Sequence, residues 1–443
     1  MEGRLRVIGQ ARFRRTRPAW QSARMQDHPL RAILNDELHA RPHLRIVPPA
    51  AISHVVLLAE EGGAEADRQA FAAFCRAHGA AEPKPGARNH IAPVAGRIVR
   101  WERHGEFQAF SVLADADAEL PPDDAWSAIH PEAQAFLDGL TGLRLAAMHL
   151  RILPGSALVP PAGAFRGEVV GGGLGGGEAQ GFTDFRMAED GFVRMVLYAN
   201  ALTPGRLGRM AQRLLEIEHY RMAALLGLPL AREATPKLAE LEKRLDSIVA
   251  KTATQGAEDR ALLDELTRLA AEAEALAATS RFRFAATEAY GALVLARIAE
   301  LNEQRLESVQ RMSVFLDRRF TPALRTCAAV ARRKRALNDG IARAGAMLRT
   351  RVEVGLEAQN SALLAAMDRR AATQLRLSQA VEGFSTFAIA YYLVSLVKIA
   401  VDGLPALGLP EGPRWVSLIA VPAVAAAIWI TLRRLRRSLS GGA

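Results

Sequence analysis

The sequence has only two cysteines and little lysine, so arginine carries nearly all of its positive charge. Cys75 and Cys327 are far apart and form no C-x-x-C pair. This argues against a disulfide framework or a zinc site and fits a reducing cytosol. The chain also lacks a G-x-S-x-G element, a kinase signature, a dinucleotide-binding fingerprint and an H-E-x-x-H pair. No cofactor and no bound metal is therefore predicted.

Acidic residues are few at both ends of the chain, although the whole sequence has a net charge of only +10. Residues 1–26 hold seven arginines against Glu2, and residues 384–443 hold six basic residues against two acidic ones. Both excesses suit contact with anionic lipid. No basic stripe interleaved with aromatic residues is present, so no nucleic-acid partner is predicted. The N-terminus lacks an apolar run, and residues 1–26 are predicted to be a disordered basic extension, not a secretory signal.

Two apolar runs near the C-terminus dominate the organisation of the chain. They are Phe384–Val401 and Trp415–Leu432, each eighteen residues long. A helix of that length spans roughly 27 Å, close to the hydrocarbon thickness of a bilayer. The runs therefore predict a two-helix transmembrane hairpin over residues 384–432. A buried helical pair in a soluble core is the alternative, but four arginines follow the second run within residues 433–437.

The orientation of this hairpin follows from its flanking charges. The link Asp402–Arg414 carries one arginine and two acidic residues, whereas arginines flank the hairpin on both outer sides. The positive-inside rule then places both termini in the cytoplasm and the link outside. The sequence thus predicts a two-pass protein of a bacterial inner membrane, with a bilayer as partner and a basic cytosolic tail over residues 433–443.

Residues 27–202 are predicted to form an α+β cytosolic domain whose strands pair largely in hairpins. Alternating apolar residues and turn signals predict its elements. The expected strands are Ser53–Ala59, Arg97–Arg103, Glu106–Leu113, Leu143–Leu153, Thr183–Met187 and Phe192–Ala199, and the expected helices are Glu65–His78 and Pro131–Gly139. The glycine run Gly171–Gly177 lacks the lysine of a phosphate-binding loop, so a flexible loop is predicted there.

Residues 203–383 are predicted to be almost entirely helical. Thr203 and Pro204 open a helix that Gly227 and Pro229 are expected to end. From Pro236 onward, apolar residues repeat at intervals of three and four, which is typical of coiled-coil-like helical hairpins. No proline occurs between Ala323 and Val401, so one long stalk helix is predicted to run into the bilayer.

Three polar clusters combine acids and bases near predicted strand ends. They contain Asn35, Glu37, His39 and Arg41; Glu102, Arg103 and His104; and Asp184 with Arg186. If they converge, a histidine or a glutamate would serve as general base and an arginine as anion clamp. Polar loops that satisfy backbone groups are the alternative explanation.

Several motifs resemble a family of uncharacterised bacterial membrane-anchored proteins, the domain of unknown function family 3422. They are Asn35–Pro42 (NDELHARP), Trp101–His104 (WERH), Thr183–Arg186 (TDFR), Gln212–Pro229, Met367–Arg370 and Gln374–Val397. The resemblance covers residues 27–437. It implies an N-terminal soluble domain and a C-terminal membrane anchor, and it implies no reaction.

The layout is similar, by analogy only, to CorA-type divalent-cation channels. That family carries Gly-Met-Asn after its first membrane helix, whereas this chain has Val401–Pro405 (VDGLP) there. The candidate residues of a membrane path are Ser385, Tyr391, Tyr392, Ser395 and Asp402. Three functions follow: a membrane-anchored homo-oligomer with a structural or interaction role, a CorA-like transporter with a divalent cation as partner, and an enzyme using Glu37, His39 and Arg41.

Overall fold

The computed structural model of the chain describes residues 27–31, 34–35, 43–58, 63–122, 125–199, 202–253, 259–403 and 415–439. The chain divides into two units. The first contains residues up to 250 together with 266–342, and the second contains 251–265 together with 343–443. The predicted basic extension over residues 1–26 lies outside the described residues.

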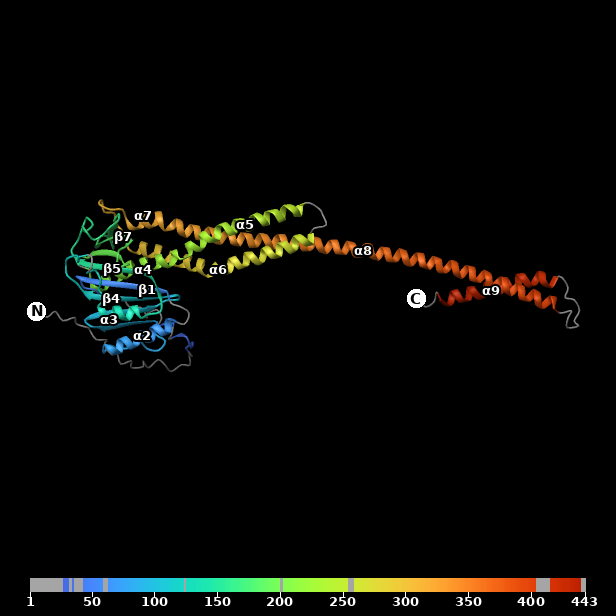
Figure 1. Cartoon of the computed structure of the whole chain (residues 1–443), viewed down its shortest axis with the longest axis horizontal. Coiled ribbons are helices and arrows are strands. Elements are labelled where there is room, and N and C mark those ends of the chain that lie inside the picture. Colours follow the sequence, from blue (N-terminus) through green and yellow to red (C-terminus); the bar gives the residue numbers. More distant parts are fainter. Residues whose placement is uncertain are drawn as a thin grey trace. The chain divides into compact units, whose positions relative to one another are not determined.

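The first unit is built on an eight-stranded sheet with the order β2-β3-β4-β1-β5-β8-β7-β6 (Figure 1). Its strands are β1 (Ala50–Leu58), β2 (Asn89–Val94), β3 (Arg97–Arg103), β4 (Phe107–Asp115), β5 (Leu143–Pro154), β6 (Val170–Leu174), β7 (Ala179–Met187) and β8 (Val193–Ala199). Neighbouring strands are antiparallel except β5 and β8, which are parallel.

Helices cover both faces of this sheet (Figure 1). Helices α2 (Gly63–Ala77) and α3 (Pro131–Asp138) pack on one face, where Phe71, Trp101 and Phe110 form the core. Helix α4 (Pro204–Leu225) packs on the other face, together with residues of α6 (Asp259–Glu300) and α7 (Met312–Arg319). Because both faces are buried, the central strand β1 reads as a nearly continuous apolar run.

The remaining elements are long helices. Helix α5 (Gly227–Ala253) pairs with α6 through Arg244 and Glu272, and with α8 (Thr321–Asp402) through Glu242 and Arg333. Helix α8 is a single element of 82 residues, which confirms the long proline-free helix. Helix α9 covers Trp415–Leu439. Among the described residues, α8 is long and apolar enough to cross a membrane, by length and composition. None of its most apolar 18-residue stretch is buried.

The α+β class is confirmed, but the expectation that strands pair largely in hairpins is wrong at the centre of the sheet. The outer strands β2-β3-β4 and β6-β7-β8 do pair as hairpins. Strand β1, however, lies between β4 and β5, which are distant in sequence, and β5 pairs in parallel with β8. Such pairings depend on tertiary packing, and hairpin turn signals do not report them.

The loop predicted for the glycine run Gly171–Gly177 is present only in its second half, where Gly175, Gly176 and Gly177 form the turn between β6 and β7 at positive φ. Gly171–Gly173 belong to the edge strand β6, and the backbone of residue 304 pairs with Gly173 in both directions, at 3.0 and 2.7 Å. A Cβ at Gly171 would lie 2.2 Å from the carbonyl oxygen of Gly181. The glycines therefore allow two backbone segments to approach the edge closely. Helix α4 ends at Leu225, just before Gly227, which confirms the predicted helix end, and Gly227 opens α5.

A glycine in α4 gives a direct test of this packing. A Cβ at Gly208 would lie 1.7 Å from the carbonyl oxygen of Leu44, so Gly208→Ala must displace the backbone. We expect a loss of about 1–3 kcal/mol in the free energy of unfolding, measured by urea titration of tryptophan fluorescence. Gly205→Ala is the matched control, because its nearest neighbour lies at 3.4 Å. Equal stability of the two variants would contradict the packing.

Candidate functional site

A histidine cluster lies between the sheet and α4. His54 of β1 contacts the Ser111 hydroxyl through Nδ1 at 2.9 Å and His219 of α4 through Nε2 at 3.2 Å. The His104 ring lies 5.7 Å from the His219 ring. Burial lowers the pKa of His54 to about 3 and holds the pKa of His219 well below its ordinary value, and the charge of Arg100 lowers both further. His54 and His219 are therefore neutral at physiological pH.

A chain of charged side chains runs beside these histidines from the sheet to α6. Arg100 pairs with Glu102 on β3 and reaches Gln212 of α4 at 3.5 Å. Gln212 donates to Glu216 at 2.7 Å, and Glu216 pairs with Arg297 of α6. The carboxylates are thus engaged by arginines or amides, which fits a role in joining sheet and helices.

Glu102 and Arg103, predicted as neighbours in one cluster, point to opposite faces of the sheet. Glu102 lies on the α4 face with Arg100, whereas Arg103 lies 3.9 Å from Glu65 of α2. His104 follows β3 and stacks on Phe107, with ring centroids 4.4 Å apart. Of the predicted cluster, Glu102 therefore joins the chain of charged side chains, His104 joins the histidine cluster, and Arg103 lies on the other face.

Asp184 and Arg186 lie on β7, five positions from β3 in the sheet. At about 4.8 Å per strand, this separates them from Glu102 by roughly 24 Å. The Asp184 carboxylate accepts from the backbone N–H groups of Gly167 and Arg186, both at 3.0 Å. It fixes a loop against the strand, and the structure does not bring it to the histidine cluster.

The remaining predicted residues of this set are only partly described. Asn35 is helical and exposed. Glu37, His39 and Arg41 lie outside the described residues. The candidate membrane-path residues Ser385, Tyr391, Tyr392, Ser395 and Asp402 all lie on α8.

A serine–histidine–aspartate arrangement across β1 and β5 was not predicted from the sequence. Ser53 Oγ lies 2.8 Å from His149 Nδ1, and His149 Nε2 lies 3.5 Å from Asp190. Ser53 is fully buried and accepts a hydrogen bond from the Ala128 N–H. Burial lowers the pKa of His149 to about 4. A nucleophile must be reachable by its substrate, so this arrangement is structural. Only the register, which pairs Ser53 with His149, reveals it.

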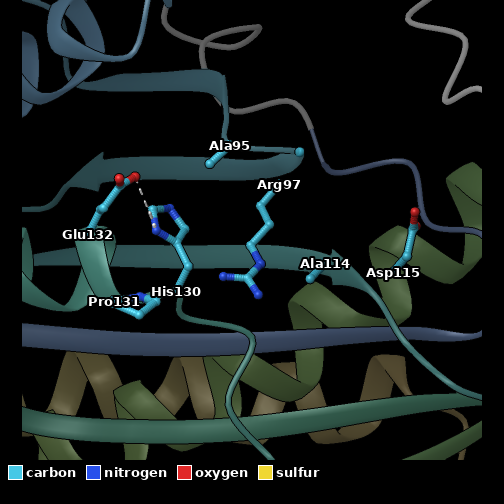
Figure 2. A pocket seen from close by; sticks show the side chains of 8 residues that line it. Ala95, Arg97, Ala114, Asp115, His130, Pro131 and Glu132 are labelled. Carbon is cyan, nitrogen blue, oxygen red and sulfur yellow. Dashed lines mark ion pairs between the residues drawn. The ribbon is translucent and has the colours of Figure 1, made fainter.

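A shallow hollow of about 510 Å³ lies beside α3 (Figure 2). Arg97, Asp115, His130 and Glu132 line it. His130 caps α3, because its Nδ1 accepts from the Ala133 N–H at 3.2 Å, and Glu132 pairs with His78 at 2.9 Å. The two carboxylates offset the arginine, so the hollow favours no single sign of ligand charge.

A larger and more apolar groove of about 680 Å³ lies between α6 and the first part of α8. Phe284, Gly291, Leu324 and Cys327 are among the residues that line it. Burial raises the pKa of the Cys327 thiol, so this cysteine is not an activated nucleophile. No group of three His, Cys, Asp or Glu residues suited to a metal occurs in the described part of the chain.

Comparison with known protein families shows to which family the chain belongs. A family model described as "Protein of unknown function (DUF3422)" matches residues 26–439. The chain belongs to this family. No curated protein and no solved structure was found to match it. Two stretches that carry the resemblance, Trp101–His104 and Gln212–Pro229, meet in the DUF3422 fold at the histidine cluster, since His104 and His219 are neighbours.

The buried neutral histidines predict a pH dependence of stability. An unfolded histidine titrates near pH 6.5, whereas folded His149 stays neutral to about pH 4. Between these values the unfolded chain binds the additional proton, so the free energy of unfolding falls as the pH falls. His149→Gln should reduce this slope by up to about 1.4 kcal/mol per pH unit between pH 4.5 and 6.

The slope is measured from urea titrations of the full-length protein at several pH values. It is independent of any constant loss of stability that the substitution causes. A His149→Gln slope equal to that of the unsubstituted protein would show that His149 is protonated in the folded state.

Proposed function

We propose that this DUF3422 protein is a membrane-anchored homo-oligomer with a structural or interaction role, held together by parallel contact between α8 helices. The observation that carries this proposal is a row of exposed apolar residues on α8 ahead of the apolar run Phe384–Val401. Large apolar side chains on a helix with a charged remainder favour burial against a partner. In this segment the chain itself supplies no cover, since nearly every described residue from 353 to 383 is exposed.

Six of the exposed large apolar residues follow a seven-residue repeat, whereas Val354, Leu364 and Leu375 lie outside it. Leu356, Leu363, Leu377 and Phe384 occupy one position of the repeat, with Arg370 between them. Met367 and Val381 occupy the second apolar position, which also holds Asn360 and Gln374. The exposed fractions of the apolar members are 52% for Leu356, 60% for Leu363, 58% for Met367, 65% for Leu377, 57% for Val381 and 78% for Phe384. Such a repeat is typical of a coiled-coil seam.

The seam also favours a particular arrangement of copies. In heptad notation Leu356, Leu363 and Leu377 occupy position d and Asn360 occupies position a, and leucine at d with a polar asparagine at a favours two strands and fixes their register. Two copies inserted in one membrane with the same topology carry their α8 helices in the same direction. Leu363 of one copy would then meet Leu363 of the other, and Asn360 would meet Asn360. We therefore propose a parallel, in-register pair.

The membrane anchor is proposed to be a two-pass hairpin of Phe384–Val401 and Trp415–Leu432, in a bacterial inner membrane with both termini cytoplasmic. The apolar window of α8 and the arginines that flank the two runs support this topology. The apolar segment Pro422–Thr431 of α9 falls within the second apolar run, Trp415–Leu432.

An interaction role explains the sheet domain better than catalysis does. The described acids and bases near β3 engage one another, and Ser53 is closed off from solvent. Ion transport would require Tyr391, Ser395 and Asp402 to face a common axis. Ser395, however, donates to the backbone oxygen of Tyr391 within its own helix, which a hydroxyl does equally in a helix without a pore.

Cysteine cross-linking tests the seam. Leu363→Cys should give a disulfide-linked dimer of the full-length protein in membranes under mild oxidation, because the two residues would face each other. Both native cysteines are buried and do not compete. Ala365→Cys is the matched control, two residues away and on nearly the opposite side of the helix. Equal cross-linking at 363 and 365, or none at 363, would contradict the seam.

Topology has its own test. A reporter that is active only in the cytoplasm, fused after Ala443, should be active, and the same reporter inserted in the link after Gly403 should be inactive. Activity at both positions would mean that the chain does not cross the membrane twice. Activity only at the inserted position would invert the proposed orientation.

A further inference from the structure

The groove between α6 and α8 lies entirely within the first unit and has a definite floor. Ser280, Phe284, Thr287, Cys327 and Lys334 line it, and each is more than nine-tenths buried. On the α6 side the groove is bordered by small exposed side chains, those of Ala285 and Ala292. A volume of about 680 Å³ falls within the range of sites that enclose small molecules.

A glycine holds the two helices close at one end of the groove. A Cβ at Gly291 would lie 2.7 Å from Leu324 Cδ1, so no side chain fits there without moving the leucine. Leu295 and Thr321 complete this end. The Thr321 hydroxyl is buried without a hydrogen-bond partner among the described residues. This end is lined mainly by apolar side chains, together with the exposed Arg325 and Glu288, and the Thr321 hydroxyl is available to a ligand.

The other end of the groove is cationic. Arg281 of α6 lies there with Arg332, Lys334 and Arg335 of α8. The antiparallel pairing of the helices places them together, since Lys334 Nζ donates to the Leu276 carbonyl at 2.6 Å and lies 5.2 Å from the Phe284 ring. Arg281 is paired with Glu274. For Arg332 and Arg335, no ion-pair partner occurs among the described residues.

The charge of the whole groove is strongly unbalanced. Its lining contains five cationic side chains, counting Arg325, and one acidic side chain, Glu288. Arginines that keep their charge at the edge of an apolar slot attract an anion whose remaining surface is apolar. We propose that the groove binds an anionic amphiphile with a single hydrocarbon chain. Its head group lies against Arg332 and Arg335, and its chain extends over Phe284 towards Leu324.

A second copy of the chain is the less suitable occupant. The five cationic side chains of the groove would then meet a chain that itself carries a net charge of +10. An acidic amphipathic helix remains as an outcome of the test.

Photo-labelling of the full-length protein in a neutral glycosidic detergent tests the proposal. The probe is hexadecanoate with a diazirine near the end of its chain. We expect labelled peptides from residues 284–295 and 321–328, and at least tenfold less labelling when unmodified hexadecanoate competes. Because labelling is mapped to residues, partition of the probe into micelles does not imitate it.

Variants separate the two halves of the site. Arg332→Gln with Arg335→Gln should reduce labelling at least tenfold by removing the head-group contacts. Ala328→Trp, at an exposed position of the wall, should block the slot. Arg232→Gln is the matched control, an exposed arginine of α5 outside the groove. An uncharged hexadecanol probe should label the groove at least tenfold less than hexadecanoate.

Three results would overturn the proposal: labelling spread over the chain, labelling unchanged in both groove variants, and equal labelling by the uncharged probe. Displacement of hexadecanoate by an acidic amphipathic peptide, at concentrations where hexadecanoate itself does not compete, would reassign the groove to a protein helix. Cysteine cross-linking at residue 363 is independent of all these results, so the failure of either proposal leaves the other to be judged separately.

Discussion

Apolar surface of α8 that no other described residue of the chain covers is the feature on which the proposed association depends. Leu356, Leu363, Leu377 and Phe384 lie at multiples of seven residues, with Arg370 between them, and each of the four is more than half exposed. Burial of such side chains in a helix seam contributes about 25 cal/mol per Å² of apolar area removed from water. Lipid can cover the run from residue 384 onward, but the segment before it carries charges such as Glu353, Arg369 and Arg376. A second copy covers that segment without burying those charges.

The sheet domain solves a different physical problem, the burial of many polar groups. His54, His149 and His219 are neutral because burial penalises their charged forms. Glu218, which is 2% exposed, is paired with Arg221. Such networks tie the sheet to its helices and specify one arrangement of them.

Local signals in the sequence predicted the elements that depend on local chemistry. The absence of proline after Pro322 predicted α8, and alternating apolar residues predicted the β3–β4 hairpin. Such local signals do not predict which strands pair when the strands are distant in the sequence. Ser53 and His149 meet only because β1 pairs with β5, and the glycines of β6 read as a loop until the approach of residue 304 is known. The groove could not be predicted from the sequence either, because it depends on which faces of α6 and α8 are exposed.

The mass of the full-length protein in detergent, measured by light scattering with the detergent contribution subtracted, tests the central claim most directly. The account predicts about twice the chain mass of 47.9 kDa, and the mass of one chain when Leu356, Leu363 and Leu377 are all replaced by serine. A monomer for the unsubstituted protein would contradict it. So would a dimer that survives the three substitutions, since α8 would then not be the contact.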